Sequence, residues 1–174
     1  QIFDISKAVF PIIKDEYSFY ADPFFSSDGS IVRAEGLNKS TGLGEIIELD
    51  SNDLEFNDVI LKGGHLSYPF SIDYQGVEYL LPETSSNSNQ IILPNPKDLQ
   101  SKIPLSGIED LRIVDATIVK YDDLYFLFGG MSDTSMDCLH LFYSNSLFGE
   151  YKKHPLNPIV IDPSSARMGG KILF

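Results

Sequence analysis

Three strand–turn–strand units recur along the chain at a nearly constant interval, and this repeat limits what it can fold into. Asp22, Tyr68 and Asp115 each stand directly before the first strand of a unit, 46 and 47 residues apart. In every unit an apolar or aromatic run leads to a polar turn and then to a second run, with turns at 27–29, 73–76 and 121–123. This pattern is typical of β-hairpins.

Each hairpin continues into two more short apolar segments. We expect third strands at 44–48, 90–93 and 139–143, and outer strands at 58–61, 102–105 and 158–161. A period of roughly 45–50 residues with about four strands in each unit is typical of propeller blades. The sequence therefore predicts an all-β fold, a partial β-propeller. A β-sandwich built from unrelated hairpins is the alternative.

The composition favours strands over helices. The chain has 12 Phe and 9 Tyr, while 13 Gly and 10 Pro are spread along its whole length. Aromatic residues are enriched in strands, and frequent Gly and Pro indicate turns. No stretch of the length of a helix shows a 3.6-residue apolar period, so we expect no helical domain.

Charge and cysteine content exclude several classes of function. The formal net charge is −12, which disfavours binding to nucleic acid or to an anionic membrane surface. No apolar run approaches the ~20 residues that a membrane helix needs, so we expect no membrane insertion. A single cysteine, Cys138, excludes an internal disulfide. No His, Cys or Asp cluster has the spacing of a metal site, and we expect no cofactor.

A fourth copy of the repeat begins at Arg167, 52 residues after Asp115. The apolar run 168–174 would form its first strand, so about three and a half blades are expected in this chain. We expect residues 1–15 to form a lead-in segment and residues 16–174 to form a propeller domain, truncated at its C-terminal end.

In a propeller the innermost strand of each blade lines the central channel, and residues at its start converge at one mouth. Asp22, Tyr68, Asp115 and Arg167 share that position, so we expect them to face a common site. An arginine there suits an anionic group such as a phosphate or uronate. The alternative for Arg167 is a salt bridge to Asp22 or Asp115.

Several short motifs resemble a known family. They occur in order along residues 20–174, as Ala21–Phe24, His65–Phe70, Tyr79–Thr84, Gly149–Pro158 and Ala166–Gly170. Together they resemble the amino-terminal domain of the glucosamine inositolphosphorylceramide transferases of plants and their bacterial relatives. That domain is related to five-bladed glycosidase propellers of the arabinanase and xylosidase type.

The resemblance implies a five-bladed propeller related to these glycosidases. In the plant enzymes sugar transfer is assigned to a separate carboxy-terminal domain, so a fused transferase domain is an expected partner in the full-length protein. In the related glycosidases the residue matching Asp22 is the general base, and one placed like Asp115 tunes the acid and orients the substrate. Their general acid is a glutamate in a later blade, where this chain has Arg167 instead.

Other carboxylates and polar groups complete the candidate site. Glu83 ends the second strand of its hairpin and is a candidate general acid, since burial can raise the pKa of a carboxyl. Glu35 holds the matching place in the first unit, where glycines stand in the third. His65 and His154 are candidates for hydrogen bonds to sugar hydroxyls. Tyr68, with its neighbour Phe70, could offer a stacking face for a pyranose ring, although core packing is the commoner use.

Three hypotheses for function remain open. The leading one is a carbohydrate-recognition domain of a glycan-modifying protein, which holds a sugar or sugar-phosphate at the channel mouth. The second is an active glycosidase with Asp22 as base and Glu83 or Asp115 as its partner. The third is a protein-interaction propeller without sugar chemistry.

Overall fold

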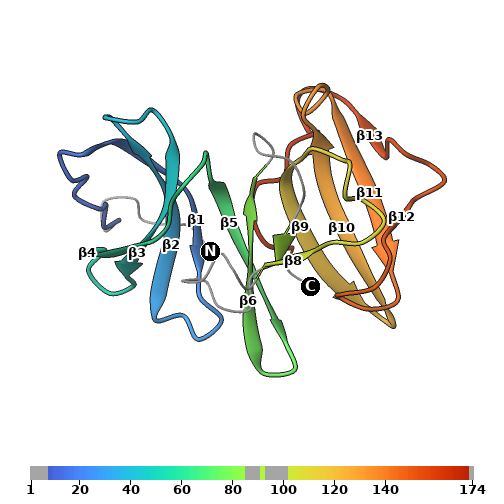
Figure 1. Ribbon diagram of the computed structural model, residues 1–174, viewed down its shortest axis with the longest axis horizontal. Coiled ribbons are helices and arrows are strands. Elements are labelled where there is room, and N and C mark those ends of the chain that lie inside the picture. Colours follow the sequence, from blue (N-terminus) through green and yellow to red (C-terminus); the bar gives the residue numbers. More distant parts are fainter. Residues whose placement is uncertain (1–7, 85–90, 93–101, 173–174) are drawn as a thin grey trace.

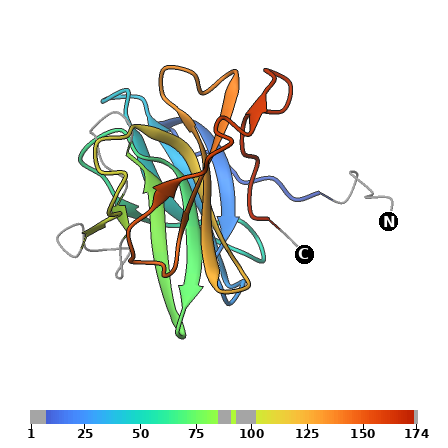
Figure 2. The same cartoon turned by 90° about the vertical axis from the view of Figure 1, so that its right-hand side faces the viewer.

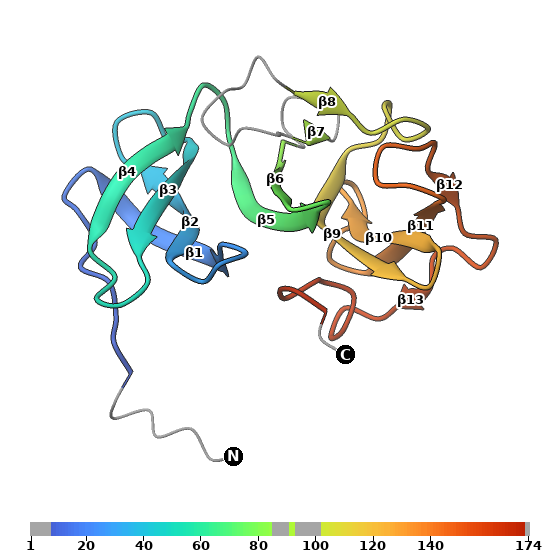
Figure 3. The same cartoon turned by 90° about the horizontal axis from the view of Figure 1, so that it is seen from below.

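The computed structural model describes residues 8–84, 91–92 and 102–172, and every regular element within these ranges is a β-strand. The strands form three successive units that lie side by side in an arc, as Figure 3 shows. Figure 1 presents the same units from blue through green to red along the sequence. The all-β partial propeller is therefore confirmed.

The first unit is a complete four-stranded antiparallel sheet in the order β1-β2-β3-β4. Its β1–β2 turn is closed by the Asp28 carboxylate, which accepts hydrogen bonds from the Ser26 and Ser30 hydroxyls at 2.7 and 2.8 Å. Such an Asp-centred turn reverses the chain within a few residues. The strands of this unit are Tyr17–Phe25, Ile31–Asn38, Gly44–Asp50 and Phe56–Leu61.

The second unit is divided into two two-stranded sheets, β5-β6 and β7-β8. In the β5–β6 turn, Gln75 and Gly76 both have positive φ, as a two-residue type I′ turn requires. Residues 90 and 93 of the expected third strand lie outside the described residues. The strands of this unit are β5 (Ser67–Tyr74), β6 (Val77–Glu83), β7 (Ile91–Ile92) and β8 (Ile103–Pro104).

The third unit forms a sheet in the order β12-β11-β10-β9, and β13 pairs with the other end of β11. The described part of the expected fourth unit differs from the prediction. Residues 162–172 contain no strand, and 173–174 lie outside the described residues. The strands of the third unit are β9 (Ile113–Tyr121), β10 (Leu124–Met131), β11 (Cys138–Ser144), β12 (Lys152–Lys153) and β13 (Val160–Ile161).

Both faces of the first sheet are apolar, which explains why the units stack. Ile46 and Ile47 are neighbours in β3 and point to opposite faces, yet both are fully buried. Ile46 packs in a cluster with Leu66 and Leu80 of the second unit, whereas Ile47 packs with Tyr17 on the other face. The largest cluster joins the second and third units through residues such as Phe70, Leu81, Ile118 and Leu127.

The hairpin turns of the three units lie at the same end of the molecule, at the bottom of Figure 2. The starts of the inner strands β1, β5 and β9 are consequently gathered toward the other end. This arrangement brings the predicted mouth residues together even though they are far apart in sequence.

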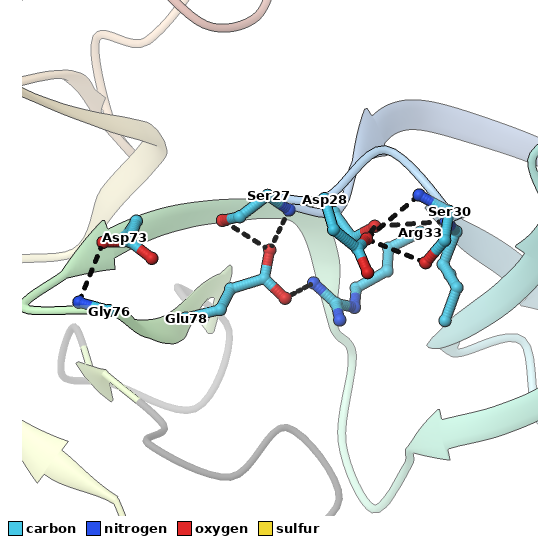
Figure 4. Close-up of a pocket in the computed structure, with 9 residues that line it drawn as sticks. Ser27, Asp28, Ser30, Arg33, Asp73, Gly76 and Glu78 are labelled. Atoms are coloured by element: carbon cyan, nitrogen blue, oxygen red, sulfur yellow. Dashed lines mark hydrogen bonds and ion pairs between the residues drawn. The ribbon is translucent and has the colours of Figure 1, made fainter.

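A buried ion network joins the first and second units near the hairpin turns (Figure 4). The Arg33 guanidinium on β2 contacts Glu48 of β3 at 3.1 Å and Glu78 of β6 at 2.8 Å. The Ser27 backbone N–H and hydroxyl donate to the other oxygen of Glu78. Burial alone would raise the pKa of Glu78, but its contacts with Arg33 and Ser27 hold the pKa below its usual value.

We predict that Glu78→Gln destabilises the fold by about 1–3 kcal/mol, because the buried Arg33 charge then loses one of its two ionic partners among the described residues and keeps Glu48. Urea denaturation followed by circular dichroism measures the change. The exposed Glu55→Gln is the matched control and is expected to leave the midpoint unchanged. Equal midpoints for the two variants would contradict a stabilising role of this network.

Candidate functional site

The three inner strands share one backbone irregularity at the predicted mouth position. Asp22, Tyr68 and Asp115 have φ of 49°, 43° and 54°, and pairing of each strand with its neighbour shifts register there. A bulge with a left-handed residue turns a side chain away from its regular alternation. The alignment of these three positions is therefore confirmed. The expectation that each stands directly before its strand is wrong, because all three lie within β1, β5 and β9, and the sequence did not indicate their left-handed backbone.

Across each bulge lies an equivalent residue of the second strand. The residues that precede the three bulged positions pair with Glu35, Glu83 and Gly130 respectively. A side chain has no room at Gly130, because a Cβ there would lie 2.9 Å from the Cα of Ser135. The matching positions of Glu35 and Glu83, with glycine in the third unit, agree with the prediction.

Arg167 and Asp115 form a direct ion pair at the mouth. Nε and Nη2 of Arg167 both lie 2.5 Å from Oδ2 of Asp115. The Asp115 backbone N–H donates to Oε2 of Glu83 at 3.0 Å, which links the third unit to the second. Burial raises the pKa of Asp115 to about 6, with smaller increases from Glu83 and Asp22, although Arg167 opposes the shift.

Asp22 links the first unit to the second. Its carboxylate accepts a hydrogen bond from the backbone N–H of Tyr68. Burial, followed by the charge of Glu83, raises the pKa of Asp22 above its ordinary value, while Arg167 lowers it. These mutual effects show that Asp22, Glu83, Asp115 and Arg167 lie within electrostatic reach of one another.

Tyr68 has a structural ring and a polar end. Its ring packs edge-on against Phe24 with centroids 4.8 Å apart, and the residue is 3% exposed. The expected stacking face for a sugar is therefore wrong for Tyr68, and equally for the buried Phe70. The Tyr68 hydroxyl instead shares a hydrogen bond with Thr117 at 2.8 Å and accepts one from the Gly170 N–H at 3.1 Å.

Glu35, His65 and Gly44 form a compact group beside Asp22. The Gly44 N–H donates to Nδ1 of His65 at 2.9 Å, so the proton of the neutral imidazole sits on Nε2. Nε2 lies 3.9 Å from Oε1 of Glu35. Burial, then the charges of Asp22 and Glu83, raises the pKa of Glu35 to about 7. The repeat alignment placed Glu35 correctly but did not reveal its pairing with His65.

His154 is not brought to this group. It lies in the turn after the outer strand β12, where its ring meets Tyr143 and its Nδ1 accepts the Leu156 N–H at 3.3 Å. Asn157, in the same turn, holds the backbone of Leu141 with both of its side-chain polar atoms. The structure gives His154 contacts within its own turn rather than at the mouth.

Metal-binding clusters and membrane-spanning helices are both absent from the described part of the chain. Within it, no three His, Cys, Asp or Glu side chains are arranged to hold a metal ion. Over the same ranges, no helix has the length and apolar character needed to span a membrane.

Antiparallel blades that lie side by side in an arc define a partial β-propeller. More specifically, the chain belongs to the family described as glucosamine inositolphosphorylceramide transferase 1, N-terminal, whose model matches residues 9–174.

Two plant relatives show how similar this chain is to longer proteins and how much of their length it matches. A glucosamine inositolphosphorylceramide transferase 1 of Oryza sativa subsp. japonica is 31% identical over 181 residues, which cover 90% of this chain and 23% of the relative. The protein of the same name from Arabidopsis thaliana is 29% identical over 168 residues, which cover 88% of this chain and 22% of that relative. The chain thus spans about a quarter of the length of these relatives.

Solved structures support the propeller fold. Bacteroides ovatus Xyloglucan PUL GH43B superposes with a TM-score of 0.59 at 15% identity, covering 86% of this chain and 31% of that one. The catalytic domain of the Coprinopsis cinerea GH62 α-L-arabinofuranosidase superposes with a TM-score of 0.59 at 13% identity. The match covers 88% of this chain and 55% of that one. An exo-β-1,3-galactanase of Phanerochaete chrysosporium, solved with β-1,3-galactotriose, superposes with a TM-score of 0.58 at 18% identity. The match covers 83% of this chain and 38% of that one. These similarities exclude the alternative of a sandwich of unrelated hairpins.

We predict that Gly44→Ala destabilises the protein by about 1–3 kcal/mol, because a Cβ would overlap the Leu66 carbonyl and lie 2.6 Å from Oε1 of Glu35. Chemical denaturation measures the loss. Gly169→Ala is the control, since a Cβ there meets nothing within 4 Å and the φ of Gly169 is not positive. If both variants unfold at the wild-type midpoint, the close packing around Gly44 is wrong.

The raised pKa of Glu35 predicts a dependence of stability on pH. Because this pKa is higher in the folded state, the contribution of Glu35 is fully present below about pH 4.5 and is lost as the pH rises through about 7. We therefore expect Glu35→Gln to gain about 1–2 kcal/mol relative to wild type between pH 4.5 and 7.5. Denaturation curves across this range test it, with Glu55→Gln as control. A difference independent of pH would refute the shift.

Proposed function

We propose that the mouth of this propeller binds a saccharide, as the recognition part of a glycan-modifying protein. The observation that carries the proposal is the convergence of three bulged inner-strand residues and Arg167 on one site. Asp22 and Asp115 come from the first and third units, and each contacts a group from a different part of the chain. A site assembled from three blades presents polar groups to a ligand from several parts of the chain.

The chemistry of the site suits hydroxyl-rich ligands. Asp22, Glu35, Glu83 and Asp115 offer carboxylate oxygens, which accept hydrogen bonds from sugar hydroxyls. Arg167 offers N–H donors to ring or hydroxyl oxygens, and it can also receive the phosphate of a sugar-phosphate. Its side chain is 43% exposed, so a ligand can reach it even while it contacts Asp115.

The comparisons support a glycan as the ligand class. The family is described by a transferase name that includes glucosamine, and the galactanase with a similar fold was solved with a galactose oligosaccharide. Because the chain covers only 23% of the rice relative, we propose that it recognises glycan for a transferase domain elsewhere in the longer protein.

A glycan array that includes neutral, uronate-containing and phosphorylated saccharides tests the proposal. We expect wild-type binding to fall at least about tenfold in Asp22→Asn and in Arg167→Ala, because each change removes a charged contact at the mouth. Asparagine tolerates the left-handed backbone of position 22, so the first variant leaves the bulge intact.

The matched controls are Asp123→Asn at a hairpin tip and Lys152→Ala on the outer strand β12, both exposed positions. Neither should change binding. Binding that both mouth variants leave unaltered would end the proposal. A blank array with the folded wild-type protein would end it as well and would favour the protein-interaction hypothesis.

A further inference from the structure

We propose that the hairpin end of the propeller carries a second saccharide site, a groove between the second and third units that binds a short neutral oligosaccharide. The groove lies beside the β5–β6 and β9–β10 turns, at the end of the molecule opposite the mouth (Figure 2). β5 runs from Tyr68 at the mouth to Tyr74 at the groove, so the two sites are roughly 20 Å apart at ~3.3 Å per residue. This inference does not rest on binding at the mouth.

The groove has the size of a small-ligand site. Its volume is about 480 Å³, within the range of roughly 300–1,000 Å³ that is usual for ligand pockets. A second cavity of about 380 Å³ adjoins it and shares Asp73, Lys120 and Tyr125 with it. The combined space favours a short oligosaccharide over a single sugar.

Aromatic rings form one wall of the groove. Tyr74 and Tyr125 both line it with ring centroids 6.1 Å apart, and Tyr74 also packs edge-on against Phe148 at 5.4 Å. Tyr125 is 7% exposed, whereas Tyr74 is half-buried, so Tyr74 offers ring surface to a ligand. The apolar C–H face of a sugar ring can pack against such a surface. At the mouth, by contrast, the ring of Tyr68 is buried in the core.

The two tyrosine hydroxyls supply polar contacts on the same wall. Within the part of the chain that the structure describes, no hydrogen bond joins the hydroxyl of Tyr74 or Tyr125 to another protein group. Burial, followed by the nearby Tyr74, raises the pKa of Tyr125, so the two hydroxyls lie within electrostatic reach of each other. A phenol hydroxyl both donates and accepts hydrogen bonds, so this pair can bind sugar hydroxyls while the rings stay packed.

Hydrogen-bond donors and acceptors of both charges surround this wall. The carboxylates of Asp73 and Asp123 accept, the Lys120 ammonium donates, and the amides of Gln75 and Asn145 do both. A ligand with a strong charge of either sign would meet a like charge in the groove. A neutral molecule rich in hydroxyls can use every one of these groups, which is why we assign the groove to a neutral saccharide.

Short turns hold these groups in place before any ligand binds. Oδ1 of Asp73 accepts the Gly76 N–H at 3.2 Å, and Gln75 and Gly76 both have the positive φ of a two-residue turn. The β9–β10 turn is equally short, because Tyr121 pairs directly with Leu124. Groups on such turns lose little conformational freedom on binding, which favours affinity.

NMR shift mapping tests the site, because backbone amides at the two ends of the molecule report separately. The probes are cellotriose, xylotriose and β-1,3-galactotriose, each titrated into nitrogen-15-labelled protein. We expect at least one of them to shift the amides of Gln75, Asp123 and Asn145 in the wild type. The same shifts should appear in the Asp22→Asn, Arg167→Ala double variant, because this binding does not need the mouth.

Two substitutions test the contacts in the groove. Tyr74→Ala removes the ring surface and should raise the Kd from the titration at least about tenfold. Asn145→Ala removes an exposed amide and should raise it about threefold or more. Asn145 lies outside the core, so its variant keeps the test decisive if Tyr74→Ala does not fold. Lys152→Ala on the outer strand β12 is the control and should bind like wild type.

The outcomes separate this site from the mouth. Shifts confined to the amides of Tyr68, Asp115 and Gly170 would overturn this inference and leave saccharide binding at the mouth standing. Shifts confined to the hairpin end would support it without any contribution from the mouth. It is also wrong if no probe shifts the hairpin-end amides at millimolar concentration, or if Asn145→Ala and a folded Tyr74→Ala both keep the wild-type Kd.

Discussion

A sheet that is apolar on both faces cannot be stable alone, and the organisation of this protein follows from that constraint. In β3, consecutive isoleucines are buried on opposite sides, so the first sheet needs cover on both. The second unit covers one side and is itself covered by the third. Stacking of this kind fixes the inner strands close to one another, and the mouth is a consequence of where those strands begin.

The electrostatics of the mouth depend on the same packing. Burial raises the pKa of Asp22, Glu35 and Asp115, because the stacked blades remove water from their carboxyls. Arg167 offsets this at one side through its contact with Asp115. The mouth therefore has an ion pair at one side and a carboxyl facing an imidazole at the other, two environments made from similar residues.

Much of the fold could be predicted from the sequence because the strand–turn–strand pattern recurs at a nearly constant interval. The spacing of Asp22, Tyr68 and Asp115 correctly aligned the three inner strands, and the same alignment placed Glu35 level with Glu83. Contacts between side chains of different units could not be predicted from the sequence, since they depend on how the blades pack. The burial of the Tyr68 ring and the Glu35–His65 pairing are of this kind.

The outer parts of the repeat were less predictable for a different reason. His154 shares a family-like motif, but it accepts a hydrogen bond from Leu156 in the turn after β12, and its ring contacts Tyr143 of β11. Residues 167–172 have the composition of an inner strand, yet the described chain there makes single contacts to Tyr68, Ser71 and Phe25 rather than a ladder. A strand forms only where a neighbouring strand offers it a continuous row of partners.

The left-handed bulge has a consequence for what the three equivalent positions can do. The backbone geometry does not depend on the identity of the side chain, since Asp, Tyr and Asp share it in one molecule. In the first and third units this bulge carries a carboxyl of the mouth, whereas in the second it carries a ring that packs in the core. A single replacement at one repeat position therefore changes either the electrostatics of the mouth or the packing between blades, according to the unit in which it lies.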